Sequence, residues 1–217
     1  MKKFLFAVPK GRISEELNPL LKKSDIIPES DFFDESSRKI IFKTNRENLE
    51  IIKVRSFDVA TFVKFGGADL GVCGRDVLEE FPSKEIFPIL DLGIGKCRLS
   101  IATKKDQRLT TYDLRLTTNS HLRVATKYPT IASKYFSTLG VQAEIIKLNG
   151  SIEIAPSLNL CDVIVDLVSS GKTLIENDMV ELEKILDVTS HLIVNRTSFK
   201  TANHEINQII KIIDETR

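Results

Sequence analysis

The run of residues 162–173, DVIVDLVSSGKT, constrains the fold of this chain more than any other segment. Its first seven residues are mostly β-branched or aliphatic, as in a strand that is buried on both faces of a parallel sheet. The apolar run ends at Ser169 and Ser170, and a helical pattern follows from residue 174 to residue 179. A strand that passes through a short loop into a helix is the repeating unit of α/β folds, so this run predicts such a fold.

The loop at the end of this predicted strand is also a predicted anion site. Small hydroxyl residues and a glycine before a helix leave several backbone N–H groups unpaired, and the helix dipole adds positive potential. Asp166 lies at the mouth of the loop, where its carboxylate would repel phosphate but could accept hydrogen bonds from sugar hydroxyl groups. Phosphate and ribose together make a phosphoribosyl group, and the residues predicted to hold its phosphate are Ser169, Ser170, Gly171, Lys172 and Thr173.

Two alternatives for this loop remain open. It is similar to the P-loop motif G-x-x-x-x-G-K-[S/T], but Asp166 occupies the position of the first glycine, so the loop could not close around the phosphates of a nucleotide in the usual way. The residues after Thr173 are also too few for the remaining strands of a P-loop domain. A plain strand–loop–helix connection that binds no ligand is the second alternative, because such strings recur by chance.

Strand-like and helix-like segments alternate along the rest of the chain, which predicts a mostly parallel sheet. Residues 104–120 are polar and without period, and we expect a surface excursion there. The predicted strands are 4–8, 39–43, 49–54, 69–73, 86–90, 98–103, 122–125, 143–148 and 185–194, and the predicted helices are 13–23, 57–65, 75–80, 130–139, 152–158 and 203–213.

Composition excludes several classes of protein. The chain has 217 residues, of which 42% are hydrophobic and 28% charged, as in ordinary globular domains. A net charge of +1 argues against nucleic acid as a partner. The sequence shows neither a signal peptide nor an apolar run long enough to span a membrane, so we expect no membrane partner. Cys73, Cys97 and Cys161 lie in apolar segments and are predicted to be buried free thiols in a reducing cytoplasm.

Lys10, Gly11 and Arg12 follow the first predicted strand and precede the first predicted helix. Such strand-to-helix turns are where α/β proteins bind ligands. Gly11 would let the backbone approach a ligand, and the two side chains add two cations. A solvated turn is the alternative, because surface loops often carry Lys and Arg.

Arg38, Arg55, Gly74, Asp76 and Glu153 are further candidates, and each has a local alternative. Either arginine alone could be an ordinary surface residue. Asp76 follows Gly74 and Arg75 and could simply cap a helix. Glu153 could favour the dipole of its own helix. The three histidines have no partner at a telling spacing, so the sequence predicts neither a nucleophilic triad nor a metal-ligand cluster.

Taken together, these segments resemble the ATP phosphoribosyltransferase family of histidine biosynthesis, in its short form. They occur in the family's order and cover nearly the whole chain. The matching segments are residues 9–12, 54–59, 67–78, 91–99, 149–156 and 162–174.

The most specific part of the family pattern runs from a Glu, through Gly and a small residue, to Asp and then Ser/Thr-Gly-x-Thr-Leu. Asn159 stands where the pattern has Gly, and Cys161 stands where the pattern has Ala, Ser or Gly. Asn tolerates a left-handed backbone better than most residues, so we expect a local adjustment and no loss of function. The residues that fit the pattern are Glu153, Asp166, Ser170, Gly171, Thr173 and Leu174.

The resemblance implies a two-lobed fold like that of type II periplasmic binding proteins. Lobe I would comprise residues 1–94 and 180–217, and lobe II residues 95–179 with the phosphoribosyl pyrophosphate loop. The short form lacks the histidine-binding C-terminal domain of the long form. It depends on a separate regulatory subunit similar to histidyl-tRNA synthetase, so the resemblance implies a cytoplasmic homodimer that joins such a subunit in a hetero-oligomer.

The resemblance also implies a reaction in which N1 of ATP attacks C1 of phosphoribosyl pyrophosphate. No proton has to be removed from N1, and Mg²⁺ would arrive with the substrates without a metal site of its own. The implied catalytic residues are Arg55, Lys10 and Asp166. The implied substrate-binding residues are Gly11, Arg12, Arg38, Gly74, Asp76, Glu153, Ser169, Ser170, Gly171, Lys172 and Thr173. A non-catalytic two-lobed module that binds a small molecule is the alternative, because the same fold serves as a solute receptor.

Overall fold

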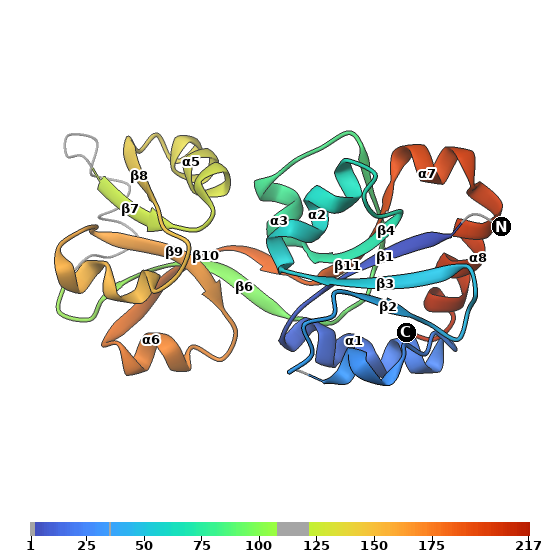
Figure 1. Ribbon diagram of the computed structural model, residues 1–217. Helices are drawn as coiled ribbons and strands as arrows, with labels where there is room; N and C mark the ends of the chain where they lie inside the picture. Colours follow the sequence, from blue (N-terminus) through green and yellow to red (C-terminus); the bar gives the residue numbers. More distant parts are fainter. Residues whose placement is uncertain (1–2, 35, 108–121) are drawn as a thin grey trace. The chain divides into compact units, whose positions relative to one another are not determined.

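The computed structural model describes residues 3–34, 36–107 and 122–217 (Figure 1). The chain divides into two compact units. Unit 1 comprises Met1–Gly95 and Thr189–Arg217, and unit 2 comprises Lys96–Val188. The chain therefore leaves unit 1 once and returns to it once, and each unit contains one sheet with its own helices.

Unit 1 is built on a six-stranded sheet whose strand order is β2-β3-β1-β4-β11-β5. β1 pairs in parallel with β3 and β4, and the other pairings are antiparallel. Phe6, Ala7 and Val8 in β1 are fully buried, which explains why this central strand is apolar without interruption. The strands are β1 (Phe4–Pro9), β2 (Ile41–Lys43), β3 (Leu49–Val54), β4 (Leu70–Gly74), β5 (Ile86–Asp91) and β11 (Ser190–Asn195).

Helices cover both faces of this sheet. Leu17 and Leu21 of α1 and Ile206 of α8 share one apolar cluster with Phe6. Val59 and Val63 of α2 belong to a second cluster with Ala7 and Ile193, formed against the opposite face. The helices of unit 1 are α1 (Arg12–Lys23), the 3₁₀ turn η1 (Ser30–Phe33), α2 (Ser56–Lys64), α3 (Arg75–Glu80), α7 (Arg196–Thr201) and α8 (Asn203–Asp214).

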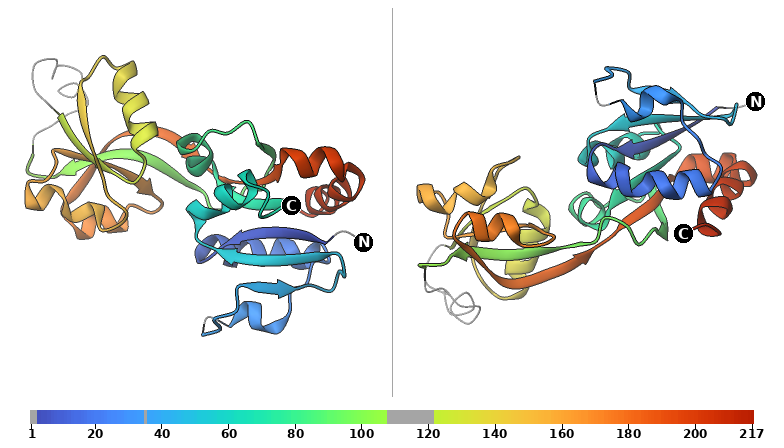
Figure 2. Two further views of the ribbon diagram at one scale, coloured as in Figure 1. Left: turned by 45° about the horizontal axis from the view of Figure 1, so that its top comes forward. Right: turned by 90° about the horizontal axis from the view of Figure 1, so that it is seen from below.

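Unit 2 is built on a five-stranded sheet whose strand order is β10-β6-β9-β7-β8. β9, β7 and β8 are parallel, whereas β6 and β10 form antiparallel pairs, and Figure 2 shows these two long strands side by side. The elements are β6 (Cys97–Lys104), β7 (Leu122–Thr126), α5 (Pro129–Thr138), β8 (Ala143–Lys147), η2 (Ile152–Ile154), η3 (Pro156–Leu158), β9 (Val163–Val168), α6 (Lys172–Glu176) and β10 (Met179–Val188).

The structure confirms an α/β fold of two units but corrects the proportion of parallel strands. Four of the nine strand pairings among the described residues are parallel, so the sheets are mixed, not mostly parallel. The antiparallel strands include β6 and β10, which adjoin the two points where the chain passes between the units. β6 leads the chain away from unit 1 and β10 leads it back, so the two strands run in opposite directions. The alternation of strands and helices in the sequence did not reveal this.

The predicted return to lobe I at residue 180 is wrong. Residues 179–188 form β10, which pairs with β6 along most of its length and therefore belongs to unit 2. The helix predicted at 174–179 ends at Glu176, because Asp178 takes a left-handed φ of 52° that no helix continues. The helix predicted at 152–158 is two 3₁₀ turns, and α7 was not predicted. Most of the excursion predicted at 104–120 lies outside the described residues.

Candidate functional site

The parallel strands of unit 2 end at one edge of its sheet, and chemically active residues gather there. The loop from Ser169 follows β9, Lys127 follows β7, and the turn after β8 leads to Glu153 in η2. Both Glu153 and Lys127 act electrostatically on the Asp166 carboxylate in β9. The edge where α/β sheets bind ligands therefore carries three interacting charges in this unit, those of Asp166, Glu153 and Lys127.

A hollow of about 140 Å³ opens at this edge. Asp166 and Glu153 form part of its wall, so a sugar held there would meet two carboxylates. The Lys172 side chain is 79% exposed and lies 3.7 Å from Glu176, and this residue is not among those that line the hollow. The lining residues are Glu153, Asp166, Leu167, Val168, Ser169, Ser170, Gly171, Thr173 and Leu174.

Backbone donors are available in this loop. Within the described part of the chain, the N–H groups of Ser170, Gly171 and Thr173 have no hydrogen-bond partner. Gly171 has a φ of 78°, a conformation that glycine adopts without strain, and it directly precedes α6. The Lys172 N–H donates to the Ser170 hydroxyl at 3.3 Å. Because α6 has only five residues, the free N–H groups contribute more to an anion site here than the helix dipole does.

The Asp166 carboxylate is half-buried, and its Oδ1 accepts a hydrogen bond from the Leu167 N–H at 2.8 Å. Burial raises the pKa of this carboxyl from its ordinary 3.8 to about 6, and Glu153 contributes to the rise. The Leu167 N–H and the positive charge of Lys127 lower the pKa and so limit the shift. At neutral pH the group is mostly ionised, so it can accept hydrogen bonds from hydroxyl groups.

The parallel strands of unit 1 also end at one edge of their sheet. β1 lies between β3 and β4, and Pro9 is paired with Val54. The Lys10 N–H donates to the Val54 carbonyl at 2.8 Å. Lys10 and Arg55, the first residues after β1 and β3, therefore lie side by side. The fold thereby brings Lys10, Gly11, Arg12, Arg55, Gly74 and Asp76 to the same edge, although they are distant in sequence.

The cations at the edge of unit 1 are exposed. Neither Lys10 nor Arg55 forms an ion pair with a residue that the structure describes, whereas Arg12 Nε lies 3.5 Å from Glu16. Arg38 is also exposed, and it precedes β2, which begins beside the carboxyl end of β3. Three or four cations are therefore available at this edge for an anionic ligand.

Asp76 differs from the other candidates because its side chain is only 5% exposed. It lies in the first turn of α3, and its charge contributes, after burial, to raising the pKa of the buried Cys73 thiol. This burial favours a role inside unit 1 over direct contact with a ligand. Cys73 and Cys161 are buried free thiols as predicted, whereas Cys97 is only half-buried.

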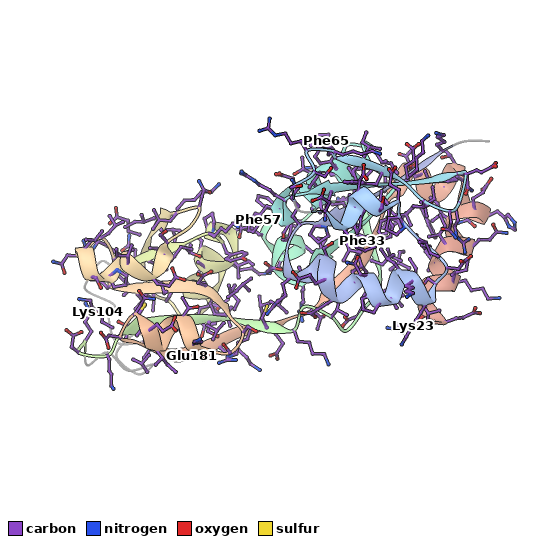
Figure 3. The ribbon with its side chains drawn as sticks, turned by 60° about the horizontal axis from the view of Figure 1, so that its bottom comes forward. Lys23, Phe33, Phe57, Phe65, Lys104 and Glu181 are labelled. Atoms are coloured by element: carbon purple, nitrogen blue, oxygen red, sulfur yellow. The ribbon has the colours of Figure 1, made fainter. Side chains whose placement is uncertain are left out.

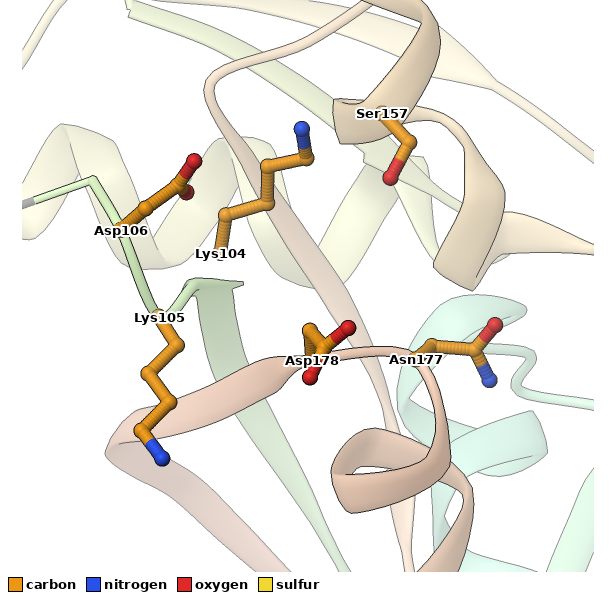
Figure 4. A pocket seen from close by; sticks show the side chains of 6 residues that line it. All are labelled: Lys104, Lys105, Asp106, Ser157, Asn177 and Asp178. Carbon is orange, nitrogen blue, oxygen red and sulfur yellow. The ribbon is translucent and has the colours of Figure 1, made fainter.

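Sequence reasoning missed Lys127, which takes the same position after β7 that Lys10 takes after β1. A lysine between a predicted strand and a helix-starting proline was the available signal. A larger hollow of about 470 Å³ in unit 2 contains none of the predicted residues (Figure 4). Its lysines are matched by aspartates, so it has no excess of either charge. The hollow is lined by Lys104, Lys105, Asp106, Ser157, Asn177 and Asp178.

Two kinds of feature are absent from the described part of the chain. No three His, Cys, Asp or Glu side chains gather there in a way that could hold a metal ion. None of the helices in the described ranges is long and apolar enough to cross a membrane.

Comparison with known proteins identifies the family. The family model for HisG, ATP phosphoribosyltransferase, matches residues 55–215. The chain is 50% identical over 206 residues to an ATP phosphoribosyltransferase of Novosphingobium aromaticivorans, covering 95% of this chain and 91% of the relative. The chain belongs to the ATP phosphoribosyltransferase family. An ATP phosphoribosyltransferase of Paramagnetospirillum magneticum is 53% identical over 204 residues, covering 94% of this chain and 92% of that relative.

Solved structures agree with this ATP phosphoribosyltransferase assignment. The ATP phosphoribosyl transferase (HisG:HisZ) complex from Thermotoga maritima contains a chain with 30% sequence identity and a TM-score of 0.81, and the match covers 98% of this chain and 97% of that one. The probable amino-acid ABC transporter extracellular-binding protein ytmK from Bacillus subtilis shares the fold alone, with a TM-score of 0.59 at 10% identity, over 99% of this chain and 91% of that one. The predicted similarity to periplasmic binding proteins is therefore confirmed.

Family membership makes this chain a transferase of histidine biosynthesis. Enzymes of this family are pentosyltransferases that transfer a phosphoribosyl group to ATP. The hollow at the end of β9 has the donors and carboxylates that such a group requires.

Proposed function

We propose that this chain binds the phosphoribosyl group of phosphoribosyl pyrophosphate in the hollow after β9, and that N1 of ATP attacks C1 of this sugar. The proposal depends on one observation, the unpartnered N–H groups of Ser170, Gly171 and Thr173 beside the Asp166 carboxylate. The N–H groups would bind the 5′-phosphate, and the carboxylate would accept hydrogen bonds from the ribose hydroxyls. Glu153, on the same hollow, would contact the ribose.

The attack needs no general base, because N1 of adenine already has a lone pair. Catalysis then rests on positioning the two substrates and on stabilising the charge of the departing pyrophosphate. Lys10, Arg12, Arg38 and Arg55 in unit 1 are the cations proposed to meet the phosphate oxygens. Mg²⁺ would enter with the substrates, because such ions are commonly held by phosphate oxygens, water and few protein ligands.

The test is a direct assay of the chain with ATP, phosphoribosyl pyrophosphate and Mg²⁺, with and without a regulatory subunit. Formation of phosphoribosyl-ATP, followed by its absorbance, is the expected result. Crystals soaked with phosphoribosyl pyrophosphate should show its 5′-phosphate on the loop from Ser169 to Thr173. Binding of both ligands without any product would favour the non-catalytic binding module, and phosphate bound elsewhere would contradict the assignment of the loop.

We also propose that the chain is cytoplasmic, forms a homodimer and joins a regulatory subunit similar to histidyl-tRNA synthetase. Support comes from the Thermotoga maritima structure, which is of a HisG:HisZ complex. Co-expression with such a subunit should give a complex that co-purifies, has higher activity and is inhibited by histidine. If histidine inhibited the chain alone, regulation would not require the second subunit, and the proposal would be wrong.

A further inference from the structure

Three side chains that line no part of the hollow form a network next to the start of the phosphate loop. Arg98 and Ser100 belong to β6. Glu181, which is labelled in Figure 3, belongs to β10. β6 is the strand between β10 and β9. Arg98 of β6 is paired with Val168 at the end of β9, directly before Ser169 begins the loop. β10 adjoins β6 on its other side.

The contacts of this network are short and directional. The Arg98 guanidinium donates to Glu181 through two nitrogens, Nε to Oε1 at 2.6 Å and Nη2 to Oε2 at 2.5 Å. The Ser100 hydroxyl donates to the same Oε1 at 2.7 Å. The remaining nitrogen of Arg98, Nη1, donates to the backbone carbonyl of Ser169 at 3.2 Å. Glu181 thus fixes the plane of the guanidinium, and the guanidinium holds the first carbonyl of the loop.

The carbonyl of Ser169 and the N–H of Ser170 belong to one peptide group. This group is planar and trans, so the carbonyl and the N–H point in opposite directions. When Arg98 holds the carbonyl, the Ser170 N–H is directed away from Arg98. This N–H is one of the unpartnered donors proposed to bind the 5′-phosphate. Rotation of the peptide would remove this donor from the site.

We propose that Arg98 and Glu181 are positioning residues that orient the peptide between Ser169 and Ser170, and so set the affinity of the loop for the 5′-phosphate of phosphoribosyl pyrophosphate. The inference rests on the proposed function of this loop. Neither residue lines the hollow, so neither is a catalytic residue. The competing explanation is a purely structural ion pair that holds β6 and β10 together.

The two explanations predict different kinetics for Arg98→Lys. Lysine keeps the charge but cannot donate to both carboxylate oxygens and to the carbonyl in the fixed fork of an arginine. If Arg98 positions the loop, this variant should raise the KM for phosphoribosyl pyrophosphate about 5- to 20-fold, with the KM for ATP unchanged within about twofold. Calorimetry should show the same loss of affinity for ribose 5-phosphate, which has the 5′-phosphate but no pyrophosphate.

Arg123→Lys is the matched control. Arg123 lies in the same unit, lies 3.2 Å from Asp162 and also donates to a backbone carbonyl, that of Asn159, at 2.9 Å. This pair lies at the opposite end of β9. The control should lower the melting temperature about as much as Arg98→Lys does and leave both KM values unchanged. Glu181→Gln, which retains the shape of the side chain and one acceptor, should give a smaller rise in the same KM.

The outcomes separate the two proposals. Native affinity for ribose 5-phosphate in a folded Arg98→Lys variant would overturn the positioning role and leave the proposed function intact. Equal rises in the KM for both substrates would also overturn it, since that result indicates a general loss of structure. A native chain that binds neither phosphoribosyl pyrophosphate nor ribose 5-phosphate would overturn both proposals. If Arg98→Lys does not fold, Glu181→Gln decides by the same comparison.

Discussion

Replacing Asp166 by asparagine should make the protein more stable at neutral pH while weakening its binding of phosphoribosyl pyrophosphate. The carboxylate is half-buried beside Glu153, and this environment raises its pKa to about 6. An ionised group with a raised pKa destabilises the fold. Asparagine removes the charge and keeps an oxygen that can accept a hydrogen bond from the Leu167 N–H.

The size of the effect follows from the shift. The pKa of Asp166 rises from 3.8 to about 6, which is roughly two units. Each unit corresponds to about 1.4 kcal/mol, so the ionised carboxylate lowers the free energy of unfolding by at most about 3 kcal/mol. Partial contact with solvent reduces this to about 1–2 kcal/mol. The direction follows from linkage: the protonated group favours the native state below about pH 4, and this contribution is lost as the pH rises through about 6.

Thermal melts of both proteins between pH 4 and pH 8 would measure this difference. Above pH 7 the variant should melt about 2–8 °C higher than the native protein, and the two should converge near pH 4. Glu176→Gln is the control, since it removes an exposed charge in the adjoining helix and should change stability by less than about 0.5 kcal/mol. Calorimetry should show phosphoribosyl pyrophosphate binding about 10- to 100-fold more weakly to the variant.

Two results would contradict this prediction. Equal melting temperatures at pH 8 would mean that the Asp166 charge does not oppose folding. Unchanged affinity for phosphoribosyl pyrophosphate would remove the carboxylate from the ribose site, whatever its effect on stability.

Three further predictions concern unit 1 and the cysteines. Arg55→Ala should lower turnover by about two to three orders of magnitude in steady-state kinetics, whereas near-normal turnover would exclude Arg55 from the site. Gly95→Ala should destabilise the protein by about 1–3 kcal/mol in denaturant unfolding, because φ is +67° and a Cβ would lie 2.8 Å from Ser190 Oγ; Ser190→Gly should recover only the steric part, and full recovery would exclude backbone strain. Mass spectrometry after thiol alkylation should find Cys97 modified before Cys73, since burial excludes the reagent from Cys73 and raises its pKa; equal rates would contradict this.

Much of the fold could be predicted because its signals are local. The amphipathic period that predicts α1 and α8 can be recognised within a dozen residues. The same holds for the residues that flank the short helix α3. The single strand predicted at 185–194 is wrong, because residues 179–188 form β10 in unit 2 and residues 190–195 form β11 in unit 1. The first six residues of β10, MVELEK, were missed because they mix charged and apolar residues without a clean alternation. The strand has two register shifts against β6, between Glu181 and Glu183 and between Lys184 and Leu186, and these break the period of two.

The candidate site likewise contains parts that local sequence predicts and parts that depend on contacts between distant residues. The loop of residues 169–173 could be proposed as a phosphate site because its residues are contiguous. The left-handed backbone expected at Asn159 is confirmed by a φ of 54°. Arg98 and Glu181 are 83 residues apart, and their pairing depends on the order of three strands that sequence periodicity does not encode. Asp76 was predicted to bind substrate because it matches the family motif, but its side chain is buried. A motif match alone does not distinguish a buried side chain from an exposed one.

The pairing of Cys97 with Val188 places the entry and exit of unit 2 at one spot. In unit 1, the Ser190 N–H donates to the Ile94 carbonyl at 2.9 Å, so the cut ends there are also neighbours. Unit 2 is thus a self-contained insertion, and a turn of two or three residues could replace it without stretching the backbone. Such a deletion would leave a shortened protein that bears Lys10, Arg12 and Arg55 but lacks the loop of residues 169–173. Binding of ATP or of phosphoribosyl pyrophosphate by this shortened protein would show which ligand the residues of unit 1 can hold by themselves.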